Sequence, residues 1–348
     1  MKIIITEAVH EDKGEVSKFL TSSNVSLAYH HIQWLEAVKE AYGHDYHYLI
    51  AKETGKIVGV LPICIFKGLL GKKSYCSLPF CDIGGVVSEK EQVREALINN
   101  ALGMIEGDNC HQLEIRQHSM KPATDTDFTN QKVSMLLELP DSSEKLMKAF
   151  RSKLRSQVKR AEKNGLTFDY ASDKRGIEDF FFIFSRNMHC LGSPVHSIKL
   201  FEALQEAYQE NLLVGRVAYD NKVVGAGILM FSGKNVSIPW ASTLKEYNRL
   251  APNMWLYWNL LRISCERGCK TFDFGRSTYQ ESTFNFKEQW GAKPALLDWQ
   301  YLDKSGQAVV YSPSKSGKLR QFVETLWKRS PLTMVNFLGP HLRKHISL

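Results

Sequence analysis

The sequence contains no long hydrophobic run. Its longest apolar stretches, such as GVLPICIF at residues 59–66, fall far short of the roughly 20 residues that a membrane-spanning helix needs. The opening residues, MKIIITEAVHEDKG, lack the pattern of a signal peptide. Cysteines are few: seven occur at irregular spacing, and no Cys or His pair stands near Cys265 and Cys269 to complete a zinc site. These absences predict a cytoplasmic protein with reduced thiols and no metal.

What the sequence does contain is enough apolar side chain for a large core, together with two basic segments. The chain has 348 residues, of which 43% are hydrophobic, and this length suggests two domains. The net charge of +8 is unevenly spread. Residues 144–163 carry eight Lys or Arg against two Glu, and residues 311–348 carry seven against one Glu. The remainder is mildly acidic, so each basic segment needs its own explanation.

One helix pattern occurs twice at a constant displacement of 166 residues. HHIQWLEAVKEAY at residues 30–42 returns as HSIKLFEALQEAY at residues 196–208. A predicted hairpin follows each copy, at residues 48–66 and 214–231, with Thr-Gly or Asp-Asn at the turn. A further strand, a helix and a short strand then follow in both halves. The repeat predicts two homologous α/β domains.

Domain boundaries follow from this register. The first domain is predicted at residues 1–138 and the second at residues 139–310, with a basic amphipathic tail at residues 311–348. The second domain opens with DSSEKLMKAFRSKLRSQVKRAEKNG, residues 141–165. This stretch has the pattern of one basic helix with an Asp or Ser cap at its start and Gly165 at its end.

The order of these elements is that of a GNAT acyltransferase domain, and two such domains in tandem resemble the FemAB family. The resemblance covers nearly the whole chain and is closest to the FemAB-like branch associated with exosortase (PEP-CTERM) and exopolysaccharide systems. It implies an α/β (α+β) tandem duplicated GNAT fold and an enzyme that joins an activated acyl or aminoacyl group to an amine. The stretches that carry it are SLPFCDIGG, KLRSQVKRAEKNGL, IPWAS, NMWLYW, FDFGRST and FNFKEQWGAKP.

The resemblance assigns catalysis to the motif FNFKEQW. The family places a Phe-Lys pair near the end of the second domain, with the lysine at the reacting carbonyl, and here that pair is Phe286-Lys287. The ammonium would stabilise the oxyanion of the tetrahedral intermediate. The neighbouring aromatic residues would partly desolvate this lysine and attract its charge. The alternative is a lysine that only extends its stem along an aromatic surface.

Two further charged residues are candidates for the site. Asp82 in LPFCDIGG matches an acidic residue that lines the family's acceptor cleft. Its carboxylate could hold the acceptor ammonium or take its proton, or it could only shape a turn with Gly84 and Gly85. Arg276 in FDFGRST could clamp a phosphate or carboxylate of the substrate. Alternatively, it forms an internal pair with Asp273.

Residues near the start of the second domain's main helix could contact the substrate as well. These candidates are Trp240, Asn253 and Tyr257. Helical spacing makes most of the aromatic residues in this region core residues first.

The donor is where the sequence departs from its relatives. Coenzyme A-using GNAT domains cradle the diphosphate on a glycine-containing loop, but NRLAPNMW at residues 248–255 has no glycine and Pro252 has no N–H. The tRNA-using FemAB enzymes carry a long helical arm, whereas only the basic helix at residues 141–165 is available here. Its Arg155 and Lys159 could contact phosphates of a donor or a lipid head group, or form a solvated basic face. Acyl-CoA and aminoacyl-tRNA are both possible donors.

The tail, which includes KLRQFVETLWKRSPLTMVNFLGPHLRKHISL, predicts an amphipathic helix. Its apolar face either docks on the first domain or lies on an anionic membrane. Together these patterns predict a FemAB-type transferase in the cytoplasm or at the inner membrane surface, forming an amide on an amine of a cell-envelope (peptidoglycan) or exopolysaccharide precursor. Two alternatives remain: an acyl-CoA-dependent N-acetyltransferase acting on a small molecule, and a non-enzymatic scaffold that binds nucleic acid or an anionic membrane. DNA is not an expected partner.

Overall fold

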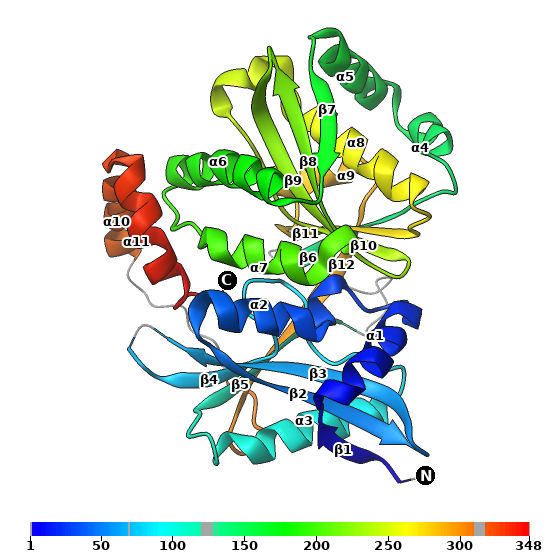
Figure 1. Cartoon of the computed structure of the whole chain (residues 1–348), viewed down its shortest axis with the longest axis vertical. Coiled ribbons are helices and arrows are strands. Elements are labelled where there is room, and N and C mark those ends of the chain that lie inside the picture. Colours follow the sequence, from blue (N-terminus) through cyan, green and yellow to red (C-terminus); the bar gives the residue numbers. More distant parts are fainter. Residues whose placement is uncertain (1, 69, 120–127, 130, 310–316, 348) are drawn as a thin grey trace. The chain divides into compact units, whose positions relative to one another are not determined.

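A computed structural model shows the fold of the chain (Figure 1). It describes residues 2–68, 70–119, 128–129, 131–309 and 317–347. The chain divides into two compact units. Unit 1 comprises Met1–Asp127, Ala295–Pro313 and Lys344–Leu348, and unit 2 comprises Phe128–Pro294 and Ser314–Arg343.

Unit 1 is a mixed sheet with helices on both faces. The described strands follow the order β1-β2-β3-β4-β5-β12, and only the pair β4/β5 is parallel. Helices α1 and α2 cover one face and α3 covers the other (Figure 1). Apolar side chains such as Leu61, Val93 and Leu97 fill the layer between α3 and the sheet. The elements are β1 (Ile4–Glu7), α1 (Lys13–Ser22), α2 (Ile32–Tyr42), β2 (Asp45–Glu53), β3 (Lys56–Lys67), β4 (Lys73–Cys76), α3 (Glu91–Ile105), β5 (Gln112–His118) and β12 (Lys293–Asp303).

Unit 2 repeats this plan. Its described strands follow the order β6-β11-β10-β9-β8-β7, and only the pair β10/β11 is parallel. Helices α6 and α7 cover one face, and α8, with α4 and α5 beside it, covers the other (Figure 1). The elements are β6 (Lys132–Glu138), α4 (Ser143–Ala149), α5 (Ser152–Lys163), β7 (Thr167–Ala171), α6 (Lys174–Leu191), α7 (Ile198–Tyr208), β8 (Leu212–Tyr219), β9 (Lys222–Ser232), β10 (Asn235–Thr243), α8 (Pro252–Glu266), β11 (Thr271–Thr278), α9 (Ser282–Glu288), α10 (Gly317–Arg329) and α11 (Leu332–Arg343).

The predicted duplication is confirmed element by element. Helices α2 and α7 begin and end at positions that differ by the same displacement seen in the sequence. The hairpins β2-β3 and β8-β9 both turn through two residues with positive φ, Thr54-Gly55 and Asp220-Asn221. Such turns match the twist of the flanking strands, which explains the choice of Gly, Asn and Asp there.

The two units exchange their last strands along the chain. The strand β6 follows β5 in the sequence but pairs antiparallel with β11 in unit 2. Conversely, β12 follows α9 but pairs antiparallel with β5 in unit 1. The compact units therefore differ from the predicted segments 1–138 and 139–310. Backbone hydrogen bonding, which the linear sequence does not display, decides to which sheet each strand belongs.

The predicted single helix at residues 141–165 is two helices, α4 and α5, and this corrects the sequence interpretation. Phe150 and Arg151 between them are extended, with ψ angles of 145° and 148°. The Phe150 ring is buried edge-on against Trp258 and Trp290, with ring centroids 6.1 and 5.4 Å away. Burying this ring takes the backbone out of the helical path. Ser142 caps the start of α4, as one of the two predicted caps.

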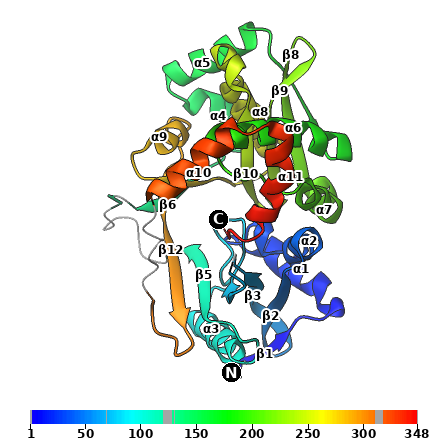
Figure 2. The same ribbon diagram turned by 90° about the vertical axis from the view of Figure 1, so that its left-hand side faces the viewer.

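The tail forms α10 and α11, which lie beside α6 within unit 2 (Figure 2). Gly192 at the end of α6 approaches Glu324 and Lys328 of α10 so closely that a side chain at this position would clash. The predicted docking of the tail's helix on the first domain is thus replaced by docking on unit 2, whereas Lys344–Ser347 belong to unit 1. Residues 311–316 and 348 of the predicted tail lie outside the described residues. No helix in the described part of the chain is both long and apolar enough to cross a membrane.

Candidate active site

The two parallel strands of unit 2 separate along their length. β10 and β11 pair over only three residue pairs, ending at Ser237↔Asp273. Beyond this point the register of β10 against β9 shifts between Ser237 and Trp240. The register of β11 against β6 shifts between Asp273 and Arg276. Bulges of this kind bend strands and redirect their side chains, and they are frequent beside active sites.

The bend in β11 is held by a buried carboxylate. Asp273 accepts hydrogen bonds from the Ser134 hydroxyl and from the Gly275 N–H, both at 2.7 Å. Gly275 has a φ of +74°, a conformation that favours glycine. Asp273 therefore has a structural role in this bend.

Lys287 is attached to this bend. Its ammonium donates to the carbonyl oxygens of Gly275 and Arg276, at 3.0 and 2.8 Å. The residue lies on the short helix α9 and is only 9% exposed. A buried ammonium is stable only where dipoles compensate its lost hydration, and here two carbonyl groups do so. The result is a fixed positive charge where β11 leaves β10.

Aromatic rings enclose the same region. Tyr257 of α8 stacks on Phe274 at 5.8 Å and meets Phe286 edge-on at 5.0 Å. Burial raises the pKa of Tyr257 to about 12, so its hydroxyl stays protonated at neutral pH. The structure thus brings together Lys287, Phe286, Tyr257 and the backbone of Arg276, four of the residues that the sequence singled out.

Other predicted contacts lie apart from this group. Trp240 packs edge-on against Phe201 of α7 at 5.0 Å and lies 6.0 Å from His196. Helix α7 covers the face of the sheet opposite α8 (Figure 1). Asn253 is exposed as the second residue of α8. Arg276 is half-buried just after the bend, near the end of strand β11.

The two basic candidates on α5 differ from one another. Arg155 is half-buried and donates to the carbonyl oxygens of Phe150 and Lys148, at 2.8 and 3.2 Å. It therefore satisfies the carbonyl end of α4. Lys159 is exposed on α5. Of the two, only Lys159 presents its charge fully to solvent.

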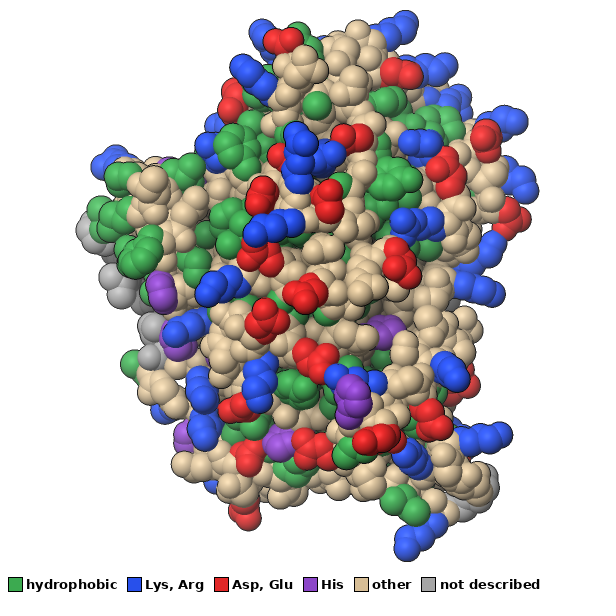
Figure 3. All heavy atoms as spheres, viewed as in Figure 1, with side chains coloured by type: hydrophobic (Ala, Val, Ile, Leu, Met, Phe, Trp, Pro, Cys, Tyr) green, Lys and Arg blue, Asp and Glu red, His purple; other side chains and the backbone are tan. Residues whose placement is uncertain are grey.

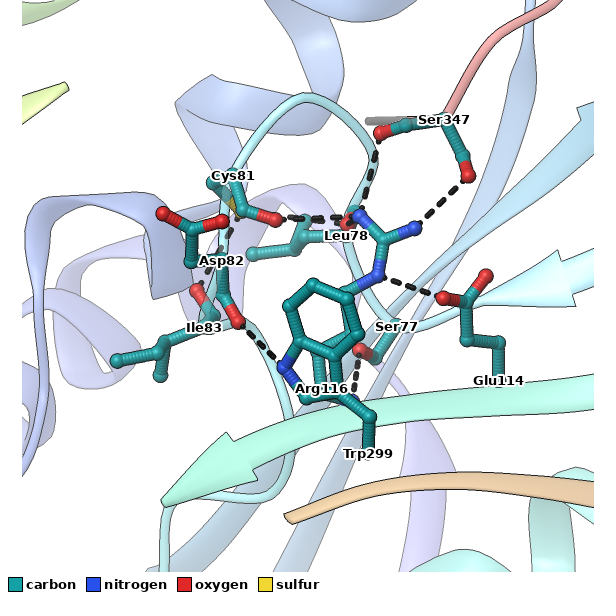
Figure 4. Close-up of polar contacts among 9 residues, drawn as sticks. All are labelled: Ser77, Leu78, Cys81, Asp82, Ile83, Glu114, Arg116, Trp299 and Ser347. Atoms are coloured by element: carbon teal, nitrogen blue, oxygen red, sulfur yellow. Dashed lines mark hydrogen bonds and ion pairs between the residues drawn. The ribbon is translucent and has the colours of Figure 1, made fainter. Parts of the chain in front are cut away.

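Asp82 belongs to unit 1, in the loop between β4 and α3 (Figure 4). The residue is half-buried, and its carbonyl oxygen accepts a hydrogen bond from the Trp299 indole at 3.1 Å. The glycines after it are needed for close packing, because a side chain at Gly84 would clash with Leu78 and one at Gly85 with Gln117. The close packing of these glycines agrees with the turn-shaping role of this loop.

Sequence reasoning missed Arg116, which organises this loop. Its side chain is 1% exposed, pairs with Glu114 at 2.8 Å and lies over the ring of Trp299 at 5.3 Å (Figure 4). One signal was available: in QLEIRQHS, Glu114 and Arg116 alternate with Leu113 and Ile115. The strand therefore carries opposite charges on one face, which predicts a buried pair.

The described residues fit neither a metal nor an ordinary diphosphate site. They contain no group of three or more His, Cys, Asp or Glu side chains that could hold a metal ion. Ahead of α8, Ala251 takes a left-handed conformation and Pro252 occupies the first turn. The N–H groups of Ala251, Met254 and Trp255 donate to carbonyl groups of this same loop. Few donors are left there to cradle a diphosphate.

Comparisons with known proteins agree with this geometry. Residues 148–288 match the model of the acetyltransferase (GNAT) domain family. The solved structure of FemX is similar with a TM-score of 0.67 and 15% identity, over 85% of this chain and 95% of FemX. L-PGS from Bacillus licheniformis gives 0.54 and 12%, over 93% and 98% of the two chains. A tandem GNAT protein from the clavulanic acid biosynthesis pathway gives 0.51 and 8%, over 90% and 100%.

No curated protein sequence matches the chain. The likeness to the solved structures, at these identities, concerns the fold, and it confirms the predicted tandem arrangement of two GNAT folds. The matched domain spans the bend in β11 and all of α9, with Lys287 inside it. The chain is therefore an acyltransferase with a tandem GNAT fold, and its unit 2 contains the GNAT acetyltransferase domain.

Proposed function

We propose that this acyltransferase is of the FemAB type and forms an amide on an amine of a peptidoglycan or exopolysaccharide precursor. The observation that carries the proposal is the buried ammonium of Lys287, fixed by two carbonyl groups where β10 and β11 separate. An immobile positive charge in a site of low polarity stabilises a developing oxyanion without reorganisation. The fold similarity to FemX and the Phe286-Lys287 motif support this reading.

Several surrounding residues have proposed roles in binding. Phe286 and Tyr257 would line the acyl group, with the Tyr257 hydroxyl as a neutral donor. Arg276 would bind an anionic group of the substrate. Asp82 in unit 1 would hold the acceptor amine or take its proton. Trp240 and Asn253 stay substrate-contact proposals with weaker support, since neither belongs to the cluster around Lys287.

We propose an anionic donor that contacts the basic helix α5. Lys and Arg side chains gather over α4 and α5 (Figure 3), and the exposed ones on α5 include Lys153, Lys159 and Arg160. Such a surface suits phosphate groups of an aminoacyl-tRNA. The poor diphosphate fit at the start of α8 weighs against acyl-CoA. A second candidate function, acyl-CoA-dependent N-acetylation of a small molecule, is favoured by the acetyltransferase domain match.

One experiment separates these functions. The purified chain is incubated with acyl-CoAs or aminoacyl-tRNAs and with a peptidoglycan precursor that carries a free amine, and new amides are detected by mass spectrometry. We expect transfer from aminoacyl-tRNA, reduced about 10²- to 10³-fold in Lys287→Ala and about 10²-fold in Asp82→Asn. Lys159→Ala is the matched variant for the donor surface and should raise KM for the donor only. Transfer from acyl-CoA alone favours the second function, and wild-type rates in folded Lys287→Ala refute the catalytic role.

We also propose contact of unit 2 with an anionic membrane surface through α10 and α11. Apolar side chains gather over these helices (Figure 3), and Phe337 is 70% exposed, with Leu326 and Met334 each 50% exposed. Lys328 and Arg329 are exposed beside them. Apolar side chains with flanking cations suit an interface with anionic lipid.

Vesicle sedimentation tests this contact. The full chain should sediment with vesicles that contain anionic phosphatidylglycerol but not with neutral phosphatidylcholine vesicles. Phe337→Ser should weaken vesicle binding several-fold. Val335→Ala, at a buried position of the same helix, should leave vesicle binding unchanged. Equal binding to both vesicle types, or none to either, contradicts the proposal.

A further inference from the structure

The last described residues of the chain are bound on unit 1 by polar contacts. The Ser347 carbonyl oxygen accepts from the Phe80 N–H at 2.7 Å and from Arg116 Nη1 at 3.2 Å. The Ser347 hydroxyl oxygen accepts from Arg116 Nη2 at 2.8 Å (Figure 4). The Ile346 side chain beside it is 41% exposed, so it is not an apolar anchor.

The same segment has two more polar contacts upstream. The Lys344 carbonyl oxygen lies 2.8 Å from His44 Nε2, and His345 Nδ1 lies 2.9 Å from the Lys67 carbonyl oxygen. Both partners belong to unit 1. The segment is therefore held mainly through its backbone, in the manner of a bound peptide.

The receiving side is built independently of the segment. The Arg116 guanidinium is fixed by Glu114 through Nε and by the carbonyl oxygens of Leu78 and Cys81 through Nη1, at 2.8, 3.1 and 3.1 Å. These partners leave Nη2 directed at Ser347 (Figure 4). Leaving a buried guanidinium N–H group without a hydrogen-bond acceptor costs free energy. The Nη2 group of Arg116 therefore requires an acceptor.

Phe80 supplies the second donor from a strained backbone. Its φ is +66°, in the left-handed region that a non-glycine residue rarely adopts. This conformation goes with an N–H aimed at the same oxygen that Arg116 binds. Because Glu114 already balances the charge of Arg116, a neutral carbonyl with an adjacent hydroxyl matches the site better than a free anion.

We infer that Phe80, Glu114 and Arg116 form a peptide-binding site of unit 1, here named the Arg116 pocket, and that residues 344–347 are its displaceable ligand. The pocket takes one main-chain carbonyl and a neighbouring hydroxyl of an extended peptide. Recognition that is mainly through backbone groups accepts other segments with Ser or Thr at the matching position. This inference does not depend on acyl transfer, and measurements of peptide binding in the pocket are sufficient to test it.

Hydrogen exchange in the full chain tests the inference. The double variant His345→Ala/Ser347→Ala removes both side-chain contacts of the segment and leaves the pocket intact. We expect the Phe80 amide to exchange about tenfold faster in this variant. Adding a millimolar excess of the acetylated pentapeptide KHISL should restore its protection. Residue-resolved mass spectrometry reports each amide.

Two controls fix the interpretation. Ser330→Ala removes a hydroxyl that donates within α10, and it should leave the Phe80 amide unchanged. The Gly84 amide, which donates to the Arg116 carbonyl oxygen at 2.9 Å, reports whether the loop itself stays folded. An unchanged Phe80 amide in the double variant overturns the inference. If the peptide fails to restore protection, or if the Gly84 amide exchanges faster by the same factor, residues 344–347 are a fixed structural part of unit 1. Either result also overturns the inference.

Discussion

His47 joins three elements of unit 1 through two carboxylates. Its ring nitrogens lie 2.8 Å from Glu7 Oε1 on β1 and 2.9 Å from Asp108 Oδ2 after α3. The Tyr75 hydroxyl donates to the same Asp108 oxygen at 2.9 Å. Protonated His47 can donate to both carboxylates at once, whereas the neutral ring can donate to only one. The stability of unit 1 should therefore depend on the charge of this residue.

The pH range follows from the pKa shifts. Burial by itself lowers the pKa of His47, but the hydrogen bonds to Asp108 and Glu7 outweigh it and raise that pKa overall. This contribution is fully present below about pH 6.5, the unfolded value, and is lost as the pH rises through the raised folded pKa. The hydrogen bond to His47 lowers the pKa of Asp108 below 3.8, so its contribution disappears only in acid. Protonated His47 and ionised Asp108 therefore coexist in the folded and the unfolded chain alike between about pH 4 and 6.5, and the hydrogen-bonded group contributes fully to stability in this range.

Solvent screening limits how much the ion pairs of His47 contribute to the free energy of unfolding. The side chains of Asp108 and Glu7 are 33% and 52% exposed, against 18% for His47. Each pair is then worth about 0.2–1 kcal/mol, or about 1 kcal/mol together. We predict that His47→Gln lowers the Tm of unit 1 by about 3 °C at pH 5.5 and by about 1 °C at pH 8. Calorimetry of the full chain, with exposed His111→Gln as the matched control, measures both. An equal loss at the two pH values would refute the reasoning.

Three further predictions concern unit 2. Phe150→Ala, which empties a buried position against Trp290, should lower the free energy of unfolding by about 3–5 kcal/mol in urea titrations; a change below about 1 kcal/mol would contradict the packing. Lys287→Met should reduce transfer about 10²- to 10³-fold while Lys287→Arg retains part of the rate, and equal rates for the two would exclude a role for the charge. Tyr257→Phe should leave the shape of the rate–pH profile between pH 6 and 9 unchanged, because the pKa of Tyr257 is raised to about 12; loss of a limb near pH 8 would argue otherwise.

Local signals in the sequence were sufficient for the duplicated fold. Helix periodicity and turn residues act over a few positions, so the repeated helices and the Thr54-Gly55 and Asp220-Asn221 turns were predictable. The desolvation of Lys287 was predictable for the same reason, since Phe284 and Phe286 precede it closely on one short helix. The break between α4 and α5 was not, because Phe150 leaves the helix to meet rings that are distant in sequence.

The sequence by itself determined the order of elements, the two homologous halves and the motif that carries Lys287. These depend on hydrophobic period, turn chemistry and neighbouring side chains. Only the tertiary structure decided that β6 and β12 change sheets, that carbonyl groups of Gly275 and Arg276 hold the ammonium, and that Arg116 binds Ser347. Each of these depends on hydrogen bonds between different elements of the fold, and such partners are chosen by the folded backbone.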